Sequence, residues 1–172
     1  AGVPYVAPIT GASSLRKGAR NVLHVRASYT NEVHRLIQRL AGMGLKGIGI
    51  VYLDNAYGRE ILEDATRALE AGKMAPSVQA AIATDGKNLA EVLNKVHAAR
   101  PSAVLLATAG TVSVALVRGL RKSVPGVLLT GLSVTLPNDS LKLVWLNRAG
   151  GRSSSYWVMM LCRRGLEVLT YS

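Results

Sequence analysis

The sequence predicts an α/β fold of three layers, in which a mostly parallel β-sheet is covered by helices on both faces. The first observation behind this prediction is a regular alternation of short apolar segments with longer segments whose apolar residues recur at helical spacing. The second is the composition of the core. The 172 residues are 49% hydrophobic but include no Phe, so aliphatic side chains must do the packing. Strands buried on both faces of a parallel sheet have this character.

Six short apolar segments are predicted to be strands, and four amphipathic segments are predicted to be helices. The first helix follows Ser28 or Thr30, either of which can cap its start. Its apolar stripe has the spacing i, i+3, i+4, i+7 and consists of Val33, Leu36, Ile37 and Leu40. The predicted strands are residues 3–7, 21–26, 47–53, 77–83, 103–108 and 127–132, and the predicted helices are residues 30–42, 57–71, 88–99 and 111–123.

The net charge of +11 is large, and its distribution decides what it means. The Lys and Arg residues occur one or two per element and form no long basic run. Aromatic residues, which make up 5% of the chain, do not alternate with them as base-stacking residues would. The pattern favours a generally basic surface, with no nucleic acid as partner, over a nucleic-acid-binding domain.

Gly42, Gly44 and Gly47 match the G-x-G-x-x-G pattern of dinucleotide-binding loops, but their context is different. A dinucleotide site needs the glycines after a strand and at the start of a helix, where backbone N–H groups meet the phosphates. Here the glycines follow the first predicted helix and precede a predicted strand. They are therefore interpreted as the end of that helix.

No other pattern indicates catalysis, a metal or a cofactor. The three His residues, at positions 24, 34 and 97, lack metal-ligand spacing, and no nucleophile motif is present. Glu60, Glu63 and Asp64 are predicted to share the water-facing side of the second helix, whereas general acid–base work needs a shielded pair. Cys162 is the only Cys, so the chain has no internal disulfide. We expect no enzyme activity, no metal site and no cofactor.

In a parallel sheet with helices on both faces, ligands bind beyond the carboxyl ends of the strands. This rule selects four loops, at residues 9–14, 54–57, 108–110 and 132–135.

Two further observations concern the ends of the sequence. The first residues lack the basic and apolar regions of a signal peptide, so we expect none in this chain. From about residue 145 the two Trp, the Cys and a run of three Ser occur without regular spacing. This tail is either a final strand with a ragged end or a segment that is not native to the fold.

Three segments together carry a family resemblance: VPYVAPITGASSLR, RNVLHVRASYTNEV and GIGIVYLDNAYGRE. In this order and at this spacing, over about residues 3–141, the chain resembles type I periplasmic solute-binding proteins of the leucine/isoleucine/valine-binding class. That family has two Rossmann-like lobes, captures a solute between them and delivers it to an ABC transporter. The resemblance implies that residues 1–20 form the end of the first lobe and the crossover. It also implies that residues 21–144 form the second lobe and that residues 145–172 are the atypical tail.

The resemblance also implies ligand-binding residues in two of the selected loops. Thr10, Gly11, Ala12 and Ser13 match the loop that offers backbone amides and a hydroxyl to the ligand's carboxylate, and their small side chains let an anion approach. The alternative is an ordinary tight turn after Pro8.

Four further positions match the ligand-contacting positions of the second lobe. Asp54 and Tyr57 lie in the strand-end loop, where Tyr57 would contact the solute; packing at a helix start is the alternative for Tyr57. Ala109 stands where an aromatic residue is expected. Ser133 stands near the position that often holds the ligand's ammonium group, and Ser can only hydrogen-bond it.

The function implied by the resemblance is capture of an amino acid, small carboxylate or amide outside the cytoplasm, in the periplasm, by a non-catalytic component of an ABC uptake system. The implied partner of the full-length protein is an ABC permease complex. A homodimer could also form through the apolar face that the missing part of the first lobe would leave bare. The alternatives are an unrelated doubly wound α/β enzyme or regulatory domain with its site in the same loops, and a basic nucleic-acid-binding domain.

Overall fold

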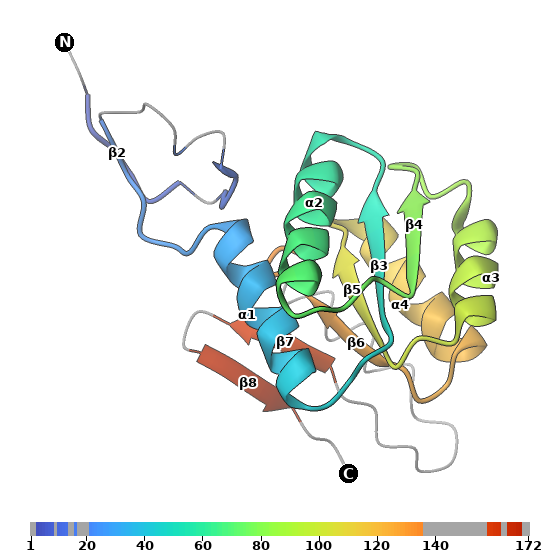
Figure 1. The fold of residues 1–172 in the computed structure, drawn as a ribbon. Coiled ribbons are helices and arrows are strands. Elements are labelled where there is room, and N and C mark those ends of the chain that lie inside the picture. The colour runs from blue at the N-terminus through green and yellow to red at the C-terminus, as the bar shows by residue number, and fades with distance from the viewer. Residues whose placement is uncertain are drawn as a thin grey trace.

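The computed structural model describes residues 3–8, 10–13, 16, 21–135, 158–162 and 165–169. Its main sheet has the strand order β4-β3-β5-β6-β7-β8 (Figure 1). The strands are β3 (Ile48–Leu53), β4 (Val78–Ile82), β5 (Ala103–Ala107), β6 (Leu128–Gly131), β7 (Val158–Cys162) and β8 (Gly165–Leu169). The helices are α1 (Tyr29–Gly42), α2 (Ala56–Ala71), α3 (Leu89–Ala99) and α4 (Thr111–Ser123).

Alternate residues of the central strands enter two hydrophobic clusters, one on each face of the sheet. Ile50 and Leu105 pack with the buried residues of α1 and α2, whereas Val51 and Leu106 pack with those of α3 and α4. This alternation follows from the two-residue period of a strand, and it makes both faces of the sheet interior. The predicted three-layer α/β fold is confirmed.

The strand pairing is parallel from β4 through β7, with Ile50 opposite Leu105 at the centre of the sheet, and β8 runs antiparallel to β7. The chain leaves β3 through α2 toward β4 on one side, and it leaves β5 through α4 toward β6 on the other. Connections that depart in opposite directions from neighbouring strands mark the point where a crevice opens beyond the carboxyl ends. β3 and β5 are those strands.

The ends of α1 follow the sequence prediction closely. The Ser28 hydroxyl accepts a hydrogen bond from the Asn31 N–H at 3.2 Å, so Ser28 rather than Thr30 is the cap. The helix ends at Gly42, and Gly44 takes the left-handed conformation, with φ of 76°. Gly42 and Gly44 therefore end a helix, as predicted, and Gly47 precedes β3.

The N-terminal strands are shorter than predicted. β1 (Tyr5–Val6) and β2 (Val22–Leu23) form a separate parallel pair that stands away from the main sheet (Figure 1). Val3, Tyr5, Val6, Leu23 and Val25 are exposed there. Among the described residues, each of these two strands pairs only with the other, and their apolar side chains are exposed, so little stabilises a longer pairing.

The tail contributes β7 and β8 at one edge of the main sheet, two strands where the sequence suggested one. Among the described residues, no helix has the length and apolar character needed to cross a membrane.

Candidate functional site

The first turns of α1 and α2 lie beyond the carboxyl end of the sheet, and the loop of residues 10–13 packs on them. The Tyr29 N–H, at the start of α1, donates to the Gly11 carbonyl at 3.0 Å. A Cβ on Gly11 would lie 2.9 Å from the Tyr29 ring, so only glycine permits this close approach. The structure thus joins the N-terminal loop to the helical lobe through backbone contact.

Ser13 connects the same loop to both helices. Its N–H donates to Glu60 Oε1 of α2 at 3.0 Å, and its hydroxyl lies 3.2 Å from the Thr30 hydroxyl of α1. Thr30 in turn donates to Asp64 Oδ2 at 2.6 Å. Loop 10–13 and the first half of α2 are therefore neighbours, although about 47 residues separate Ser13 from Glu60 in the chain.

These contacts correct the prediction that the acids of α2 face water. Asp64 is buried, with 7% of its surface exposed, and Glu60 is half-buried, whereas Glu63 is exposed as predicted. Asp64 shares the inward side of α2 with Ile61 and Ala65, and the Thr30 hydroxyl provides the hydrogen bond that a buried carboxylate needs.

Tyr57 stands at the start of α2, where Asn55 caps the helix by accepting from the Gly58 N–H at 2.9 Å. A Cβ on Gly58 would lie 1.9 Å from the Leu53 carbonyl oxygen, so glycine allows α2 to begin directly against the end of β3. The Tyr57 ring meets the Tyr29 ring edge to face, with 5.3 Å between the ring centres. Tyr57 is thereby held between α1 and the loop after β3.

The Tyr57 hydroxyl is buried and has no hydrogen-bond partner among the described residues. Burial raises the pKa of this hydroxyl above its ordinary value of 10.0, and the nearby Tyr29 and Glu32 act in the same direction. A buried hydroxyl without a partner forgoes about 1–3 kcal/mol that a hydrogen bond would recover. This group is suited to receiving a polar atom of a bound molecule.

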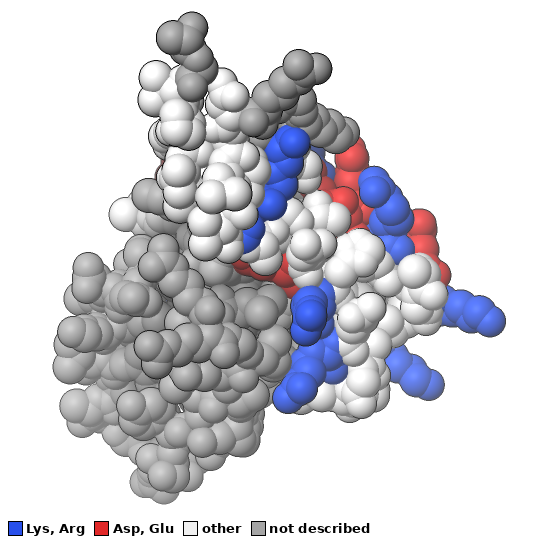
Figure 2. All heavy atoms as spheres, turned by 90° about the vertical axis from the view of Figure 1, so that its left-hand side faces the viewer, with Lys and Arg blue, Asp and Glu red and all other residues white. Residues whose placement is uncertain are grey.

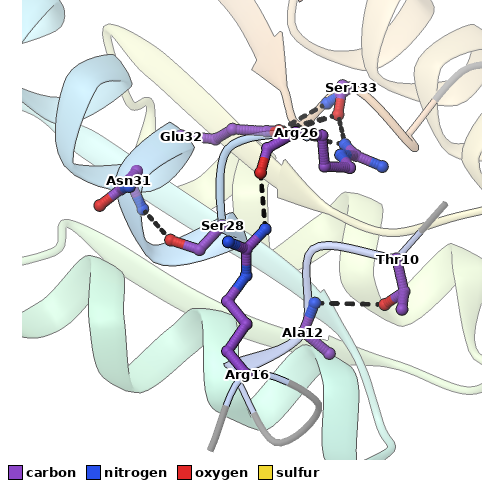
Figure 3. Close-up of polar contacts among 8 residues, drawn as sticks. All are labelled: Thr10, Ala12, Arg16, Arg26, Ser28, Asn31, Glu32 and Ser133. Atoms are coloured by element: carbon purple, nitrogen blue, oxygen red, sulfur yellow. Dashed lines mark hydrogen bonds and ion pairs between the residues drawn. The ribbon is translucent and has the colours of Figure 1, made fainter. Parts of the chain in front are cut away.

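Arg26, Glu32 and Ser133 form a second polar cluster at the same edge (Figure 3). The Arg26 guanidinium donates to Glu32 Oε1 at 2.9 Å and also contacts the Ser133 hydroxyl. The Ser133 N–H donates to Glu32 Oε2 at 3.0 Å, and its hydroxyl lies 2.9 Å from both carboxylate oxygens. The cluster joins the segment before α1, α1 itself and the loop after β6.

The guanidinium of Arg26 also lies 5.3 Å from the centre of the Tyr29 ring, at cation–π distance. Its backbone carbonyl accepts from the Arg16 guanidinium at 2.7 Å (Figure 3). Through these contacts, Arg26 links the polar cluster to the aromatic pair and to the N-terminal loop.

The site residues expected from the sequence separate into two groups. Thr10, Gly11, Ala12, Ser13, Tyr57 and Ser133 all lie around the first turns of α1 and α2. Asp54 is exposed and pairs with Arg59 at 2.8 Å on the surface. Ala109 packs against the cluster that α3 and α4 form on the opposite face of the sheet.

The structure adds Arg26, Tyr29, Thr30, Glu32 and Glu60 to the predicted set. One signal for Glu32 was present in the sequence. Glu32 lies three residues after Tyr29 and four residues before Leu36, so it occupies a core position of the α1 stripe. An acid on an apolar stripe indicates a buried partner. Arg26 and Glu60 carried no such signal.

Three of the ten Asp and Glu residues of this basic chain take part in these contacts: Glu32, Glu60 and Asp64. Asp54 and Glu63 lie nearby in the chain but are exposed. Figure 2 shows Lys and Arg side chains dispersed over the face that carries α1, with acidic side chains between them. Within the described ranges, no group of His, Cys, Asp and Glu is arranged to hold a metal ion.

Comparisons with known proteins agree with this architecture. A structure of a substrate-binding periplasmic protein from Ralstonia solanacearum shares 30% identity with a TM-score of 0.74, covering 84% of this chain and 40% of that one. The fold is also that of an R. palustris ABC transporter solute-binding protein in complex with benzoate (18% identity, TM-score 0.75, covering 94% and 44%). A third structure is a branched-chain amino acid ABC transporter protein from Thermus thermophilus with bound valine. It shares 16% identity with a TM-score of 0.72, covering 92% of this chain and 40% of that one.

The chain thus spans less than half the length of these solved relatives. A search of the curated proteins finds no match. The sequence profile of the family described as periplasmic binding protein matches residues 1–138, which is most of the chain. The chain belongs to the periplasmic binding protein family.

Proposed function

We propose that this chain forms part of the solute-binding component of an ABC uptake system and captures a small amino-acid-type solute without altering it. The observation that carries the proposal is the position of loop 10–13 on the first turns of α1 and α2, together with the buried Tyr57 hydroxyl of α2, which has no partner among the described residues. Two chain segments far apart in sequence meet there, as a site between two lobes requires.

The chemistry of the edge supports binding over catalysis. The half-buried Tyr57 ring can offer an apolar surface, with the buried Tyr29 ring packed against it, and loop 10–13 brings hydroxyls and amides to the same first turns of α1 and α2. The Glu32 carboxylate already accepts from Arg26 and Ser133, so it is poorly placed to act as a general base. Such a site grips a solute by hydrogen bonds and apolar contact, and the gain in affinity comes from closure of the lobes around it.

The proposed ligand class is an amino acid, a small carboxylate or an amide. A single carboxylate or amide oxygen can accept from the Tyr57 hydroxyl, while an apolar group packs on the half-buried Tyr57 ring. Two relatives with the same fold hold benzoate and valine, which both combine a carboxylate with an apolar part.

The proposed partner of the whole protein is an ABC permease complex, and the proposed location is the periplasm or another extracytoplasmic space. Nucleic acid is not a proposed partner, because the basic residues are dispersed and the site itself contains the acids Glu32, Glu60 and Asp64. The exposed apolar residues of β1 and β2 also favour a homodimer through this strand pair, which light scattering of the chain would detect.

A thermal-shift screen of the chain with valine, leucine, benzoate and small amides tests the proposal. A solute that binds the native state at 100 times its Kd adds about 2.7 kcal/mol of stability, which raises Tm by several degrees. Tyr57→Phe should reduce that shift, and Tyr5→Phe, which removes an exposed hydroxyl on β1, should leave it unchanged.

Mass spectrometry of the released solute separates this proposal from a doubly wound enzyme with its site in the same loops. We expect the solute to be recovered intact. A solute that is chemically converted, or a screen in which no solute raises Tm, would contradict capture without chemistry.

A further inference from the structure

Loop 10–13 carries the hydrogen-bond donors that a bound anion would need. The N–H groups of Ala12 and Ser13 and the Ser13 hydroxyl already have partners within the chain. The Ala12 N–H donates to Thr10 Oγ1 at 3.1 Å, and the Ser13 N–H donates to Glu60 Oε1 at 3.0 Å. The acceptor on Ser13 is thus itself a carboxylate, the same chemical group that the proposed solutes carry.

The hydroxyl proton of Ser13 is used as well. A carboxylate accepts and does not donate, so the 2.6 Å contact between Thr30 and Asp64 uses the single proton of the Thr30 hydroxyl. Across the 3.2 Å contact between Ser13 and Thr30, the proton must therefore come from Ser13. Both donors of Ser13 point, directly or through Thr30, to the acids Glu60 and Asp64, which lie four residues apart on one side of α2.

Resting on the proposed function, we propose that Glu60 is an internal competitor for the ligand's carboxylate and so determines the affinity of the site for anions. Its carboxylate occupies Ser13 N–H when no solute is bound. A carboxylate solute gains this donor only by displacing Glu60 and by accepting its like charge nearby. Glu60 thereby favours solutes that offer enough further contacts, such as packing on the half-buried Tyr57 ring, over simple anions.

The position of Glu60 supports displacement. Asp64 is buried and receives the short Thr30 hydrogen bond, whereas Glu60 is half-buried, and Ser13 is the one partner of its carboxylate within the described ranges. Because Glu60 is half-buried, its side chain can rotate away from the loop into water without leaving an unpaired charge in the interior. A purely structural contact would make the opposite prediction, because removing Glu60 would then loosen the loop and weaken anion binding.

Acetate, which is a carboxylate with almost no apolar part, tests the competition without knowledge of the natural solute. The Ser13 amide signal of the isotopically labelled chain is followed by NMR during titration with sodium acetate, with sodium chloride at equal ionic strength as reference. Glu60→Gln keeps the length of the side chain and removes its charge. We expect it to lower the apparent Kd for acetate at Ser13 about tenfold, the scale of one charge-assisted hydrogen bond.

Glu63→Gln, on the exposed side of the same helix, is the matched control and should behave as the unmodified chain. Glu60→Ala, with the best helix former at this position, should reproduce the gain and serves if Glu60→Gln folds poorly. The proposal is overturned if the Glu60 variants bind acetate no better than the unmodified chain, or if Glu63→Gln gives the same gain. A gain specific to Glu60 in a chain that no solute of the thermal-shift screen stabilises would uphold the competition and count against the proposed ligands.

Discussion

The α/β body of residues 26–135 and the N-terminal segment of residues 3–16 and 21–25 are held in place by different forces. In the body, both faces of the sheet are covered, and side chains such as Ile50 and Leu105 have no exposed surface. In the N-terminal segment, Leu23 is 62% exposed and Val25 is 71% exposed. The described contacts that tie this segment to the body are hydrogen bonds, among them that of Ser13 with Glu60, and limited packing of Gly11 and Ala12 against the core. Hydrophobic burial fixes the lobe, and mainly polar contacts place the loop on it.

The largest expected effect comes from making the same change, Leu to Ala, in each of the two regions. Leu105→Ala deletes a fully buried side chain from the centre of the sheet and should lower the free energy of unfolding by about 2–5 kcal/mol. Leu23→Ala removes the same atoms from an exposed strand and should change it by less than about 0.5 kcal/mol. Urea unfolding measures both, with equal slopes m expected for the two variants.

Equal losses from these two variants would mean that β2 is buried in solution. In that case the N-terminal strand pair would have a partner that covers it, and the contrast between the two regions would disappear.

The same contrast explains how much of the fold the sequence predicts. The four helices and the central strands were predicted to within one or two residues at each end, because each buries one regular stripe on a covered sheet. The predicted strands at residues 3–7 and 21–26 are shorter in the structure, at Tyr5–Val6 and Val22–Leu23, because their apolar side chains are exposed and gain little from pairing. An alternation of apolar and polar residues predicts a strand well only where the apolar side chains are buried.

For the site, sequence reasoning placed the loops but not their polar partners. Connection order brings the ends of β3 and β6 to one edge, so Tyr57 and Ser133 were within reach of prediction. The pairing of Ser13 with Glu60 depends on how a loop outside the main sheet lies on α2. Neither periodicity nor connection order contains that information.

A smaller effect is expected where the two regions join, at Arg26. Arg26→Met keeps an apolar stem over the Tyr29 ring but leaves the buried Glu32 carboxylate without the guanidinium, at a cost of about 1–3 kcal/mol. Adding Glu32→Gln to this variant removes the stranded charge. The double variant should therefore lose less than the sum of the two single losses, by roughly 1 kcal/mol in a double-mutant cycle measured by urea unfolding. Strict additivity would mean that Arg26 and Glu32 do not interact in solution.

The smallest effect concerns Tyr57, where the loop meets the body, and it appears only in alkali. Because burial raises the pKa of Tyr57 in the folded chain, the unfolded chain loses this proton first, near pH 10, while the folded chain keeps it. Above that pH the unfolded state binds fewer protons, so stability falls as pH rises toward the folded pKa.

One proton contributes at most about 1.4 kcal/mol per pH unit in this range, and less where solvent reaches the ring. Tyr57→Phe removes the contribution, so its free energy of unfolding should fall less steeply between pH 10 and 11.5 than that of the unmodified chain. Since the hydroxyl has no described partner, the variant should be no less stable at pH 7. Equal slopes in alkali would mean that water reaches this hydroxyl in the folded chain, and a clear loss at pH 7 would mean that the hydroxyl makes a hydrogen bond. Either result would contradict its assignment as a buried group that is available to a solute.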